Sequence, residues 1–333
     1  MRNSRFKIVS CERMNLMHNE IFRDQEYIHR LKDAIYEQYG IAAAKITPAN
    51  RGYYGETWKV HADSGLYFLK MDYLPFHQKK FQQSLSVIEY LCENGIDFVG
   101  RIIKTQGNEL YSNFDTAVMG LFEWVDGKNV ETDQTKSTEY QMLCKIYLLT
   151  RPGLAIPTAV FSDDAAIRFY QQWEKLKSAP KAEADCAVLA IFERFKEEIA
   201  HCASRLSKFA GDCREDSGDF YLTHGDAGGN FFIAHGRNYI LDWDEVMYAP
   251  LERDAWVMGC YDWARELFHD TLKANKIPYQ LRPERLAFYC YHMYFFYLNE
   301  FLMVHPICDK SQRIQEYFEN GWIKNRIKFA DTI

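Results

Sequence analysis

Three polar residues between positions 221 and 254 have the types and the spacing to do chemistry together. A His-Gly-Asp triplet places Asp226 at the end of a short predicted strand, and Asn230 follows four residues later, after two glycines. A predicted hairpin then returns through Asn238 and ends at Asp242. A carboxylate on a loop, an amide just beyond it and a carboxylate at the end of the next hairpin can meet around one site.

This set of residues suits the transfer of a phosphoryl group. The reaction needs a carboxylate that orients an attacking hydroxyl and accepts its proton, and oxygen ligands that hold Mg²⁺ against a triphosphate. Mg²⁺ prefers hard oxygen ligands and takes only one or two from a protein. Asp226 would be the base, and Asn230 and Asp242 the metal ligands. Alternatively, the triplet is a turn and the other polar side chains are solvated. The occurrence of Asp226, Asn230 and Asp242 in this order favours an active site over that alternative.

The elements that must position these residues form a β-rich first third followed by a helical remainder. Apolar spacing and the turn residues separate the two kinds of element. The expected helices cover residues 24–39, 76–94, 136–150, 163–177, 185–209 and most of the chain from 251 onward. The expected strands cover 44–50, 57–61, 66–71, 101–105, 116–125 and a short β insertion at 221–243. This order predicts two lobes that join near residues 120–127.

The segment 221–254 resembles the Brenner-type motif of the aminoglycoside phosphotransferase and choline kinase superfamily, and the resemblance covers roughly Lys45–Asp254. Its stretch DWDEVMYAPLERD is similar to the spectinomycin-type phosphotransferases. The resemblance implies an α+β, two-lobed, protein-kinase-like fold. Residues 24–123 would form a small β-rich, nucleotide-binding N-lobe with one key helix, and residues 124–333 a larger, mostly helical C-lobe for catalysis and substrate binding. Residues 1–23 would be a flexible N-terminal extension.

The same resemblance implies a phosphate-binding lysine and its partner. Lys70, in the strand YFLKMDY, would contact the α- and β-phosphates. Glu89, in the helix SLSVIEYL, would pair with that lysine, although Asp72 and Glu93 are neighbours that could take its place. The alternative for Lys70 is an exposed strand lysine with no role in binding.

Two further segments would complete the nucleotide site. Residues 52–57, with Gly52 and Gly55, resemble the loop that covers the nucleotide, and a plain β-turn is the alternative. The segment 119–124, which ends in Glu123 and Trp124, resembles the hinge whose backbone groups would contact the purine of ATP or GTP. In the motif LERD, Asp254 resembles the aspartate that braces the catalytic loop.

The loop after the triplet departs from the family pattern. Four steps separate Asp226 from Asn230, where the family usually has five. Gly228 and Gly229 would permit the tighter loop, because glycine tolerates unusual backbone angles. We expect His224 to support this loop through hydrogen bonds rather than to act as a base.

The charge of the chain is concentrated in one segment. The 333 residues carry a formal net charge of −6, yet residues 211–270 contain 13 acidic and 4 basic side chains. An acidic wall suits a small cationic acceptor, although metal ligands, helix caps and solvated surface are the alternative explanation. A pI near 6.0 argues against a general nucleic-acid binder. The sequence indicates no obligate protein partner.

Compartment follows from the cysteines and from one apolar segment. The nine cysteines are scattered without a close pair, which is typical of a reduced, cytoplasmic protein. The most apolar stretch, residues 288–304, contains His292, Asn299 and Glu300, and we expect a buried aromatic helix rather than a membrane span.

These observations predict a small-molecule kinase. It would transfer the γ-phosphoryl group of ATP or GTP, with Mg²⁺, to a hydroxyl of an amine-bearing acceptor such as an aminoglycoside or aminocyclitol antibiotic. One alternative is a metabolite kinase for choline, homoserine, methylthioribose or a fructosamine. The other is a catalytically weak nucleotide-binding module.

Overall fold

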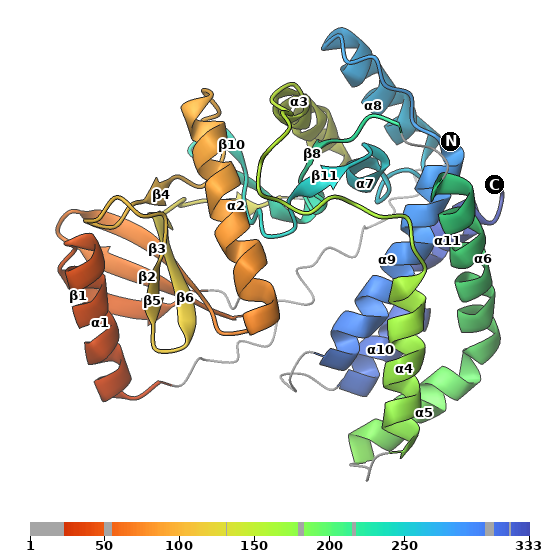
Figure 1. Ribbon diagram of the computed structural model, residues 1–333, viewed down its shortest axis with the longest axis horizontal. Helices are drawn as coiled ribbons and strands as arrows, with labels where there is room; N and C mark the ends of the chain where they lie inside the picture. The colour runs from red at the N-terminus through yellow and green to blue at the C-terminus, as the bar shows by residue number, and fades with distance from the viewer. Residues whose placement is uncertain are drawn as a thin grey trace, which may run out of the picture. The chain divides into compact units, whose positions relative to one another are not determined.

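The computed structural model describes residues 23–49, 55–130, 132–178, 183–214, 218–303, 310–319 and 321–333 (Figure 1). The expected N-terminal extension, apart from Arg23, and Gly52 of the expected nucleotide loop lie outside these residues. The chain divides into two compact units. The sheet unit comprises the described residues up to Pro157 together with Leu222–Tyr248, and the helical unit comprises Thr158–Tyr221 and Ala249–Ile333.

The sheet unit is built on an antiparallel sheet with the strand order β1-β2-β3-β6-β4, in which β5 also pairs with β6. The strands are β1 (Ala43–Pro48), β2 (Gly55–Ala62), β3 (Gly65–Asp72), β4 (Ile102–Ile103), β5 (Ser112–Phe114) and β6 (Ala117–Glu123). The predicted meander is therefore confirmed. Lys70 of β3 lies between Thr57 of β2 and Gly120 of β6 in the register of the sheet.

Helix α1 (Gln25–Tyr39) covers one face of this sheet. Asp24 caps it by accepting a hydrogen bond from the Tyr27 amide at 2.7 Å, and Gly40 ends it with a φ of 70°. Its apolar side packs with Leu69 and Met71 of β3 in one buried core. Burial of such side chains stabilises the fold by about 1.5–3 kcal/mol each. Because successive side chains of a strand point to opposite faces, Lys70 lies on the other face.

Helix α2 (Pro75–Glu93) contacts β3, β4 and β6. It begins with a proline, which is favourable in the first turn because that position donates no hydrogen bond within the helix. The buried ring of Phe81 lies 5.3 Å from the Lys70 ammonium. A Cβ at Gly120 would come within 2.8 Å of the same ring, so this site in β6 has no room for a side chain. Helix α2 therefore packs on the face of the sheet that carries Lys70.

A second, three-stranded sheet of order β10-β9-β7 belongs to the same unit. It contains β7 (Lys128–Asn129), β9 (Phe231–Ala234) and β10 (Arg237–Ile240), and the short helices η2 (Asp133–Thr135) and η3 (Gly228–Asn230) and helix α3 (Lys136–Tyr147) lie in this unit too. Strand β8 (Tyr221–Thr223) pairs with β11 (Met247–Ala249).

The sheet unit extends beyond Glu123, where the predicted N-lobe ends, and continues to Pro157. Strand β7 pairs with β9, and the Ile240 amide donates to the Phe98 carbonyl at 2.9 Å. Arg237 forms an ion pair with Asp97 at 2.7 Å. These contacts between residues more than 100 positions apart join the hairpin to the sheet unit, and local sequence patterns do not reveal them.

The helical unit is centred on α9 (Pro283–Met303), which contacts α4, α6, α7, α10 and α11. The other helices are α4 (Asp164–Ser178), α5 (Glu183–Arg194), α6 (Lys196–Arg214), α7 (Glu252–Ala255), α8 (Asp262–Ala274), α10 (Lys310–Glu319) and α11 (Trp322–Ala330). Most side chains of α9 are buried, so the predicted aromatic helix is confirmed over its described length. The segment expected as one helix at 185–209 forms two, α5 and α6.

None of the helices in the described part of the chain combines the length and the apolar character that a membrane span requires. An antiparallel sheet in the first part of the chain and a helical later part confirm the predicted α+β fold class.

Candidate active site

His224 organises the loop that carries Asp226. The imidazole is fully buried and packs edge-to-face against Trp243, with the ring centroids 4.6 Å apart. Its Nδ1 accepts a hydrogen bond from the Asp226 amide at 3.2 Å, and its Nε2 lies 3.0 Å from the Leu241 carbonyl. Because Nδ1 accepts, Nε2 carries the proton that is donated to Leu241. The prediction that this histidine supports the loop through hydrogen bonds is confirmed.

The structure brings Asp226 and Asn230 into contact. The side-chain amide of Asn230 donates to the Asp226 carbonyl at 3.0 Å and to its Oδ2 at 3.1 Å. The second half of this loop is the 3₁₀ turn η3. A Cβ at Gly229 would come within 2.9 Å of the Asp226 carboxylate, so a larger residue there would displace that side chain.

The predicted reason for the two glycines of this loop is therefore wrong. Gly225 has a φ of 89°, whereas Gly228 and Gly229 lie in the 3₁₀ turn η3, whose right-handed backbone does not require glycine. Asn129 of β7, which the sequence did not single out, donates its side-chain amide to the Gly229 carbonyl. The turn is thus held from the neighbouring strand.

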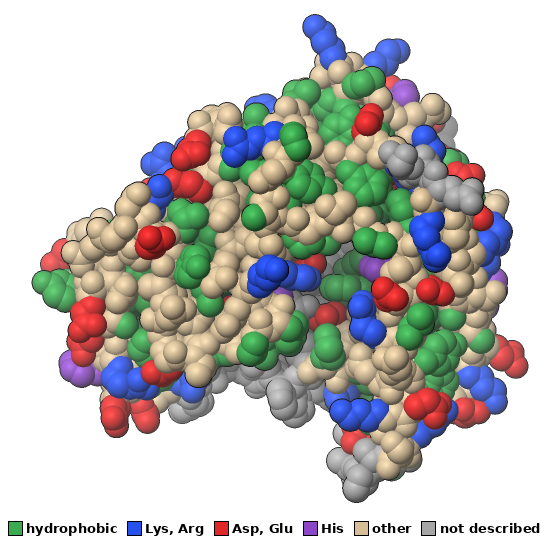
Figure 2. Space-filling model, viewed as in Figure 1, with side chains coloured by type: hydrophobic (Ala, Val, Ile, Leu, Met, Phe, Trp, Pro, Cys, Tyr) green, Lys and Arg blue, Asp and Glu red, His purple; other side chains and the backbone are tan. Residues whose placement is uncertain are grey.

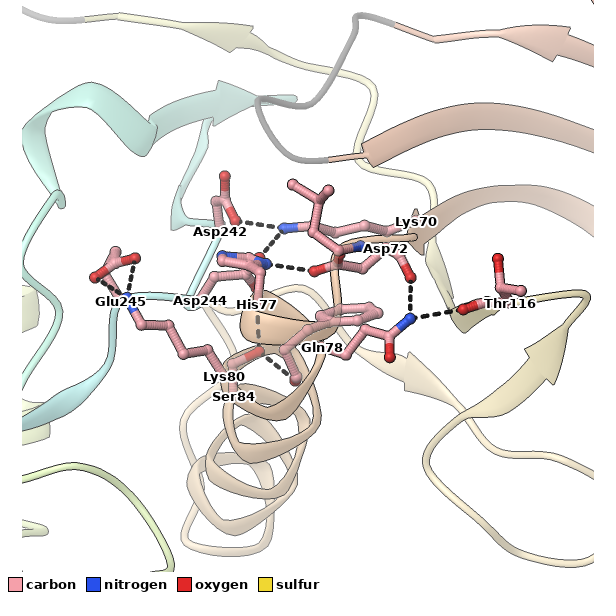
Figure 3. A network of polar contacts seen from close by, with 12 residues as sticks. Lys70, Asp72, His77, Gln78, Lys80, Ser84, Thr116, Asp242, Asp244 and Glu245 are labelled. Atoms are coloured by element: carbon pink, nitrogen blue, oxygen red, sulfur yellow. Dashed lines mark hydrogen bonds and ion pairs between the residues drawn. The ribbon is translucent and has the colours of Figure 1, made fainter. Parts of the chain in front are cut away.

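Lys70 meets two carboxylates from the end of the β9–β10 hairpin (Figure 3). Its Nζ lies 2.7 Å from Asp242 Oδ1 and 2.6 Å from Asp244 Oδ2. The Asp242 side chain is 53% exposed, and that of Asp244 only 11%. Asp242 has a φ of 57°, a left-handed conformation that costs free energy for a non-glycine residue and is concentrated at functional sites. The structure thus places Lys70 beside one of the predicted metal ligands.

Burial and charge act against each other in this cluster. Burial lowers the pKa of Lys70, but Asp242 and Asp244 outweigh burial and raise it above its ordinary value. Burial raises the pKa of Asp242, but the Lys70 ammonium more than offsets this and holds the pKa below the usual range. For Asp244, burial and the neighbouring Asp242 prevail over Lys70, and the pKa is raised. Two carboxylates that share one ammonium leave an excess of negative charge, which suits a further cation.

The predicted pairing of Glu89 with Lys70 is wrong. Glu89 forms an ion pair with Lys104 instead. The face of α2 toward the site carries Phe81 and Ser84, and Glu89 lies about 140° around the axis from Ser84 because each residue turns a helix by about 100°. Asp244 takes the place at Lys70 that the resemblance implies for Glu89. The second aspartate of the Asp-Trp-Asp sequence was the available signal.

Gly55, Glu123 and Trp124, which are also predicted to bind the nucleotide, make contacts within the sheet unit. Gly55 begins β2, where a Cβ would overlap the Met71 carbonyl at 1.9 Å. At the predicted hinge, the Glu123 amide donates to the Arg101 carbonyl at 2.9 Å and the Trp124 amide donates to Leu66 at 3.2 Å. These two N–H groups are therefore already engaged within the protein. Asp254 lies in α7 of the helical unit.

The chemistry of the donor set fits a hard divalent cation. Asp242 offers a half-exposed carboxylate, and the Asn230 amide nitrogen faces Asp226, so its oxygen is the atom with ligand character. Two protein oxygens, with water and phosphate, are a usual complement for Mg²⁺.

The chain is similar to known phosphotransferases in sequence and in fold. The model of a family described as the phosphotransferase enzyme family matches residues 45–289. A spectinomycin phosphotransferase solved with ADP and spectinomycin has a TM-score of 0.76 at 17% identity, with 92% of this chain and 98% of that chain covered. An amicoumacin kinase solved with AMP-PNP and Ca²⁺ has a TM-score of 0.57 at 14% identity, with 93% and 94% covered. A choline kinase from Streptococcus pneumoniae has a TM-score of 0.55 at 14% identity, with 93% and 100% covered. These likenesses show a protein-kinase-like fold.

Proposed function

The chain belongs to the phosphotransferase enzyme family, whose model matches residues 45–289. From this membership we propose the group that the protein transfers and the acceptor that receives it. The protein transfers the γ-phosphoryl group of ATP or GTP to a hydroxyl of a small, amine-bearing acceptor, an aminoglycoside or aminocyclitol antibiotic. The observation that carries the proposal is the contact of Lys70 with Asp242 in the same unit that pairs Asp226 with Asn230.

Asp226 is the proposed base. Its carboxylate accepts a hydrogen bond from Asn230 and its amide is bonded to the buried His224, so the side chain has a defined orientation. In this position it would orient the acceptor hydroxyl and take its proton. A positioned general base contributes roughly 10²–10⁴ in rate.

Lys70, Asp242 and Asn230 form the proposed phosphate and metal side of the site. Lys70 would exchange a carboxylate for the oxygens of the triphosphate, and the raised pKa keeps its amine charged for that purpose. Asp242 and Asn230 would hold Mg²⁺, which when bound neutralises charge on the β- and γ-phosphates. The half-exposed Asp242 carboxylate is accessible for this role.

The preference for a cationic acceptor rests on local charge. Asp226, Asp242, Asp244 and Glu245 lie within twenty positions of each other and belong to the acidic segment 211–270. Over the face drawn in Figure 2, acidic and basic side chains are intermixed, so no broad acidic surface contributes in that view. Two of the similar solved proteins are named for antibiotics, spectinomycin and amicoumacin, which supports an antibiotic acceptor.

A metabolite kinase is the second candidate, favoured by the similarity to a choline kinase over nearly the whole chain. A catalytically weak nucleotide-binding module is a third reading, suggested by the short loop after Asp226. The contact of Asp226 with Asn230 across that loop argues against it.

A phosphorylation screen tests the proposal. Purified protein with Mg²⁺ and ATP or GTP is offered aminoglycosides, spectinomycin, choline and amino sugars, and a phosphorylated antibiotic is expected. Expression in a sensitive strain should raise the minimal inhibitory concentration of the same antibiotic. Phosphorylation of choline or a sugar with no change in resistance would favour the metabolite kinase instead. Absence of any Mg²⁺-dependent ATP or GTP hydrolysis would favour the binding module.

A further inference from the structure

A buried Asp-His pair lies between the end of β3 and the first turn of α2. The Asp72 side chain and the His77 imidazole are each about 2% exposed, and His77 Nδ1 is hydrogen-bonded to Asp72 Oδ2. The other oxygen of Asp72 accepts the Leu74 amide at 2.9 Å. The carboxylate therefore fixes both the entry into α2 and the orientation of the imidazole ring, in the way that an outer carboxylate fixes a ligating histidine.

The opposite edge of the His77 ring faces Asp244. His77 Nε2 lies 3.8 Å from Asp244 Oδ2, the same oxygen that accepts from Lys70 at 2.6 Å. Ser84 Oγ lies 3.2 Å from the other oxygen, Oδ1, and 2.8 Å from the Phe81 carbonyl, so its single proton is shared between these two acceptors. Two side chains of α2 thus approach the two carboxylate oxygens of Asp244, Ser84 at hydrogen-bond distance and His77 at the longer distance of 3.8 Å (Figure 3).

A third contact joins the same face of α2 to Glu245, which follows the β9–β10 hairpin. Lys80 Nζ lies 2.9 and 3.1 Å from the two carboxylate oxygens of Glu245. His77, Lys80 and Ser84 are separated by three and four residues, which places them on one side of a helix. One helix face therefore holds two acidic residues immediately beyond the predicted metal ligand Asp242.

We propose that His77, oriented by Asp72, is a positioning residue that keeps Asp244 on α2 and so sets where Lys70 stands. The inference rests on the proposed function. When Lys70 turns to the triphosphate it must give up a carboxylate, and an Asp244 that is held by α2 cannot follow it. Without His77, Asp244 is able to stay with the ammonium and competes with the phosphates for it. Helix α2 thus acts on Lys70 through Asp244 and not through Glu89.

Two substitutions of His77 separate the contacts of its two nitrogens. In His77→Asn the amide lies near the position of Nδ1, so contact with Asp72 is kept and contact with Asp244 is lost. In His77→Gln the amide reaches toward the position of Nε2 and Asp244. The matched control is His29→Asn on α1, where a 78% exposed histidine lies 3.6 Å from Asp33. On α2, Ser84→Ala is compared with Ser86→Ala, since Ser86 is exposed.

The measurements are calorimetric binding of Mg·ADP, the KM values for nucleotide and acceptor, and the melting temperature. In His77→Asn we expect the nucleotide Kd and KM to rise about tenfold, with an unchanged acceptor KM. His77→Gln should recover most of this loss, and Ser84→Ala should weaken nucleotide binding while Ser86→Ala and His29→Asn do not.

An unchanged nucleotide Kd and KM in His77→Asn, with only a lower melting temperature, would overturn the inference, because the ring would then merely fill the core. Equal losses in His77→Asn and His77→Gln would also contradict it. A wild-type protein that binds nucleotide but phosphorylates none of the acceptors would overturn the proposed acceptor alone, since the binding comparison still decides the role of His77. A wild-type protein that binds no nucleotide would overturn both.

Discussion

Neutralising Asp244 should have opposite effects on stability depending on whether Lys70 is present. The two side chains are 11% and 17% exposed and lie 2.6 Å apart, so their interaction is only weakly screened by solvent. In the wild type, Asp244→Asn removes a charge-assisted hydrogen bond but leaves Lys70 its second partner, Asp242. We expect the free energy of unfolding to fall by about 1–2 kcal/mol.

Removal of the ammonium reverses the sign. Lys70→Met leaves Asp242 and Asp244 facing each other, and loss of one partner of a buried ion pair costs about 3–5 kcal/mol. Because Asp242 is half exposed and can be hydrated, we expect a value near the lower end. In that background the Asp244 carboxylate is buried and unpaired with Lys70, so adding Asp244→Asn should raise the free energy of unfolding by about 1–2 kcal/mol.

Urea unfolding of the wild type, both single variants and the double variant measures this coupling. The expected interaction energy is about 2–4 kcal/mol, the sum of the two opposite effects. Asp97→Asn, at the exposed pair with Arg237, is the control and should change nothing measurable. Additive effects of Lys70→Met and Asp244→Asn would refute the assignment of Asp244 as the partner of Lys70.

Three other outcomes follow from the structure. Gly229→Ala places a Cβ 2.9 Å from the Asp226 carboxylate and should lower kcat at least tenfold with little change in nucleotide Kd. The control is Gly211→Ala in α6, where a Cβ meets nothing within 4 Å and kcat should stay unchanged. Equal kinetics of the two variants would contradict the prediction. Asp242→Ala should abolish the dependence of nucleotide binding on Mg²⁺, and calorimetry with and without the metal could show the opposite. Burial and the nearby Arg168 and Arg253 lower the pKa of His292 to about 4. Below pH about 6.5 the unfolded chain binds a proton at this histidine that the folded protein does not bind until about pH 4. The free energy of unfolding should therefore fall between these two pH values, by at most about 1.4 kcal/mol per pH unit. His292→Gln should flatten this part of a melting-temperature profile, and an unaltered profile would count against the explanation.

Local patterns were sufficient for much of the sheet unit. Alternation and turn residues predicted the meander that contains Lys70, and the spacing of Asp226 and Asn230 predicted that two polar side chains of one loop would meet, as they do. Helical spacing likewise predicted α9 as a buried aromatic helix, although its neighbours in the fold could not be read from it.

Predictions failed where they depended on rotation or on distant pairing. The resemblance implies Glu89 as the partner of Lys70, but the rotation of α2 turns Glu89 toward Lys104 and presents His77 and Ser84 to Asp244. The predicted boundary after Glu123 follows the change in composition, whereas the sheet unit continues to Pro157 and includes the pairing of β7 with β9. Neither the orientation of a helix about its axis nor a contact across 100 residues is specified by a short window of sequence.

Asp226 is the proposed base of the phosphoryl transfer. Its most direct test is a single-turnover measurement with Asp226→Asn, which keeps the shape of the side chain and the hydrogen bond from Asn230. The acceptor is the one identified by the phosphorylation screen, and nucleotide binding is measured on the same preparation. We predict that the rate of transfer falls by about 10²–10⁴ while Mg·nucleotide binds with unchanged affinity. Transfer at the wild-type rate, with the nucleotide bound equally well, would show that Asp226 is not the base.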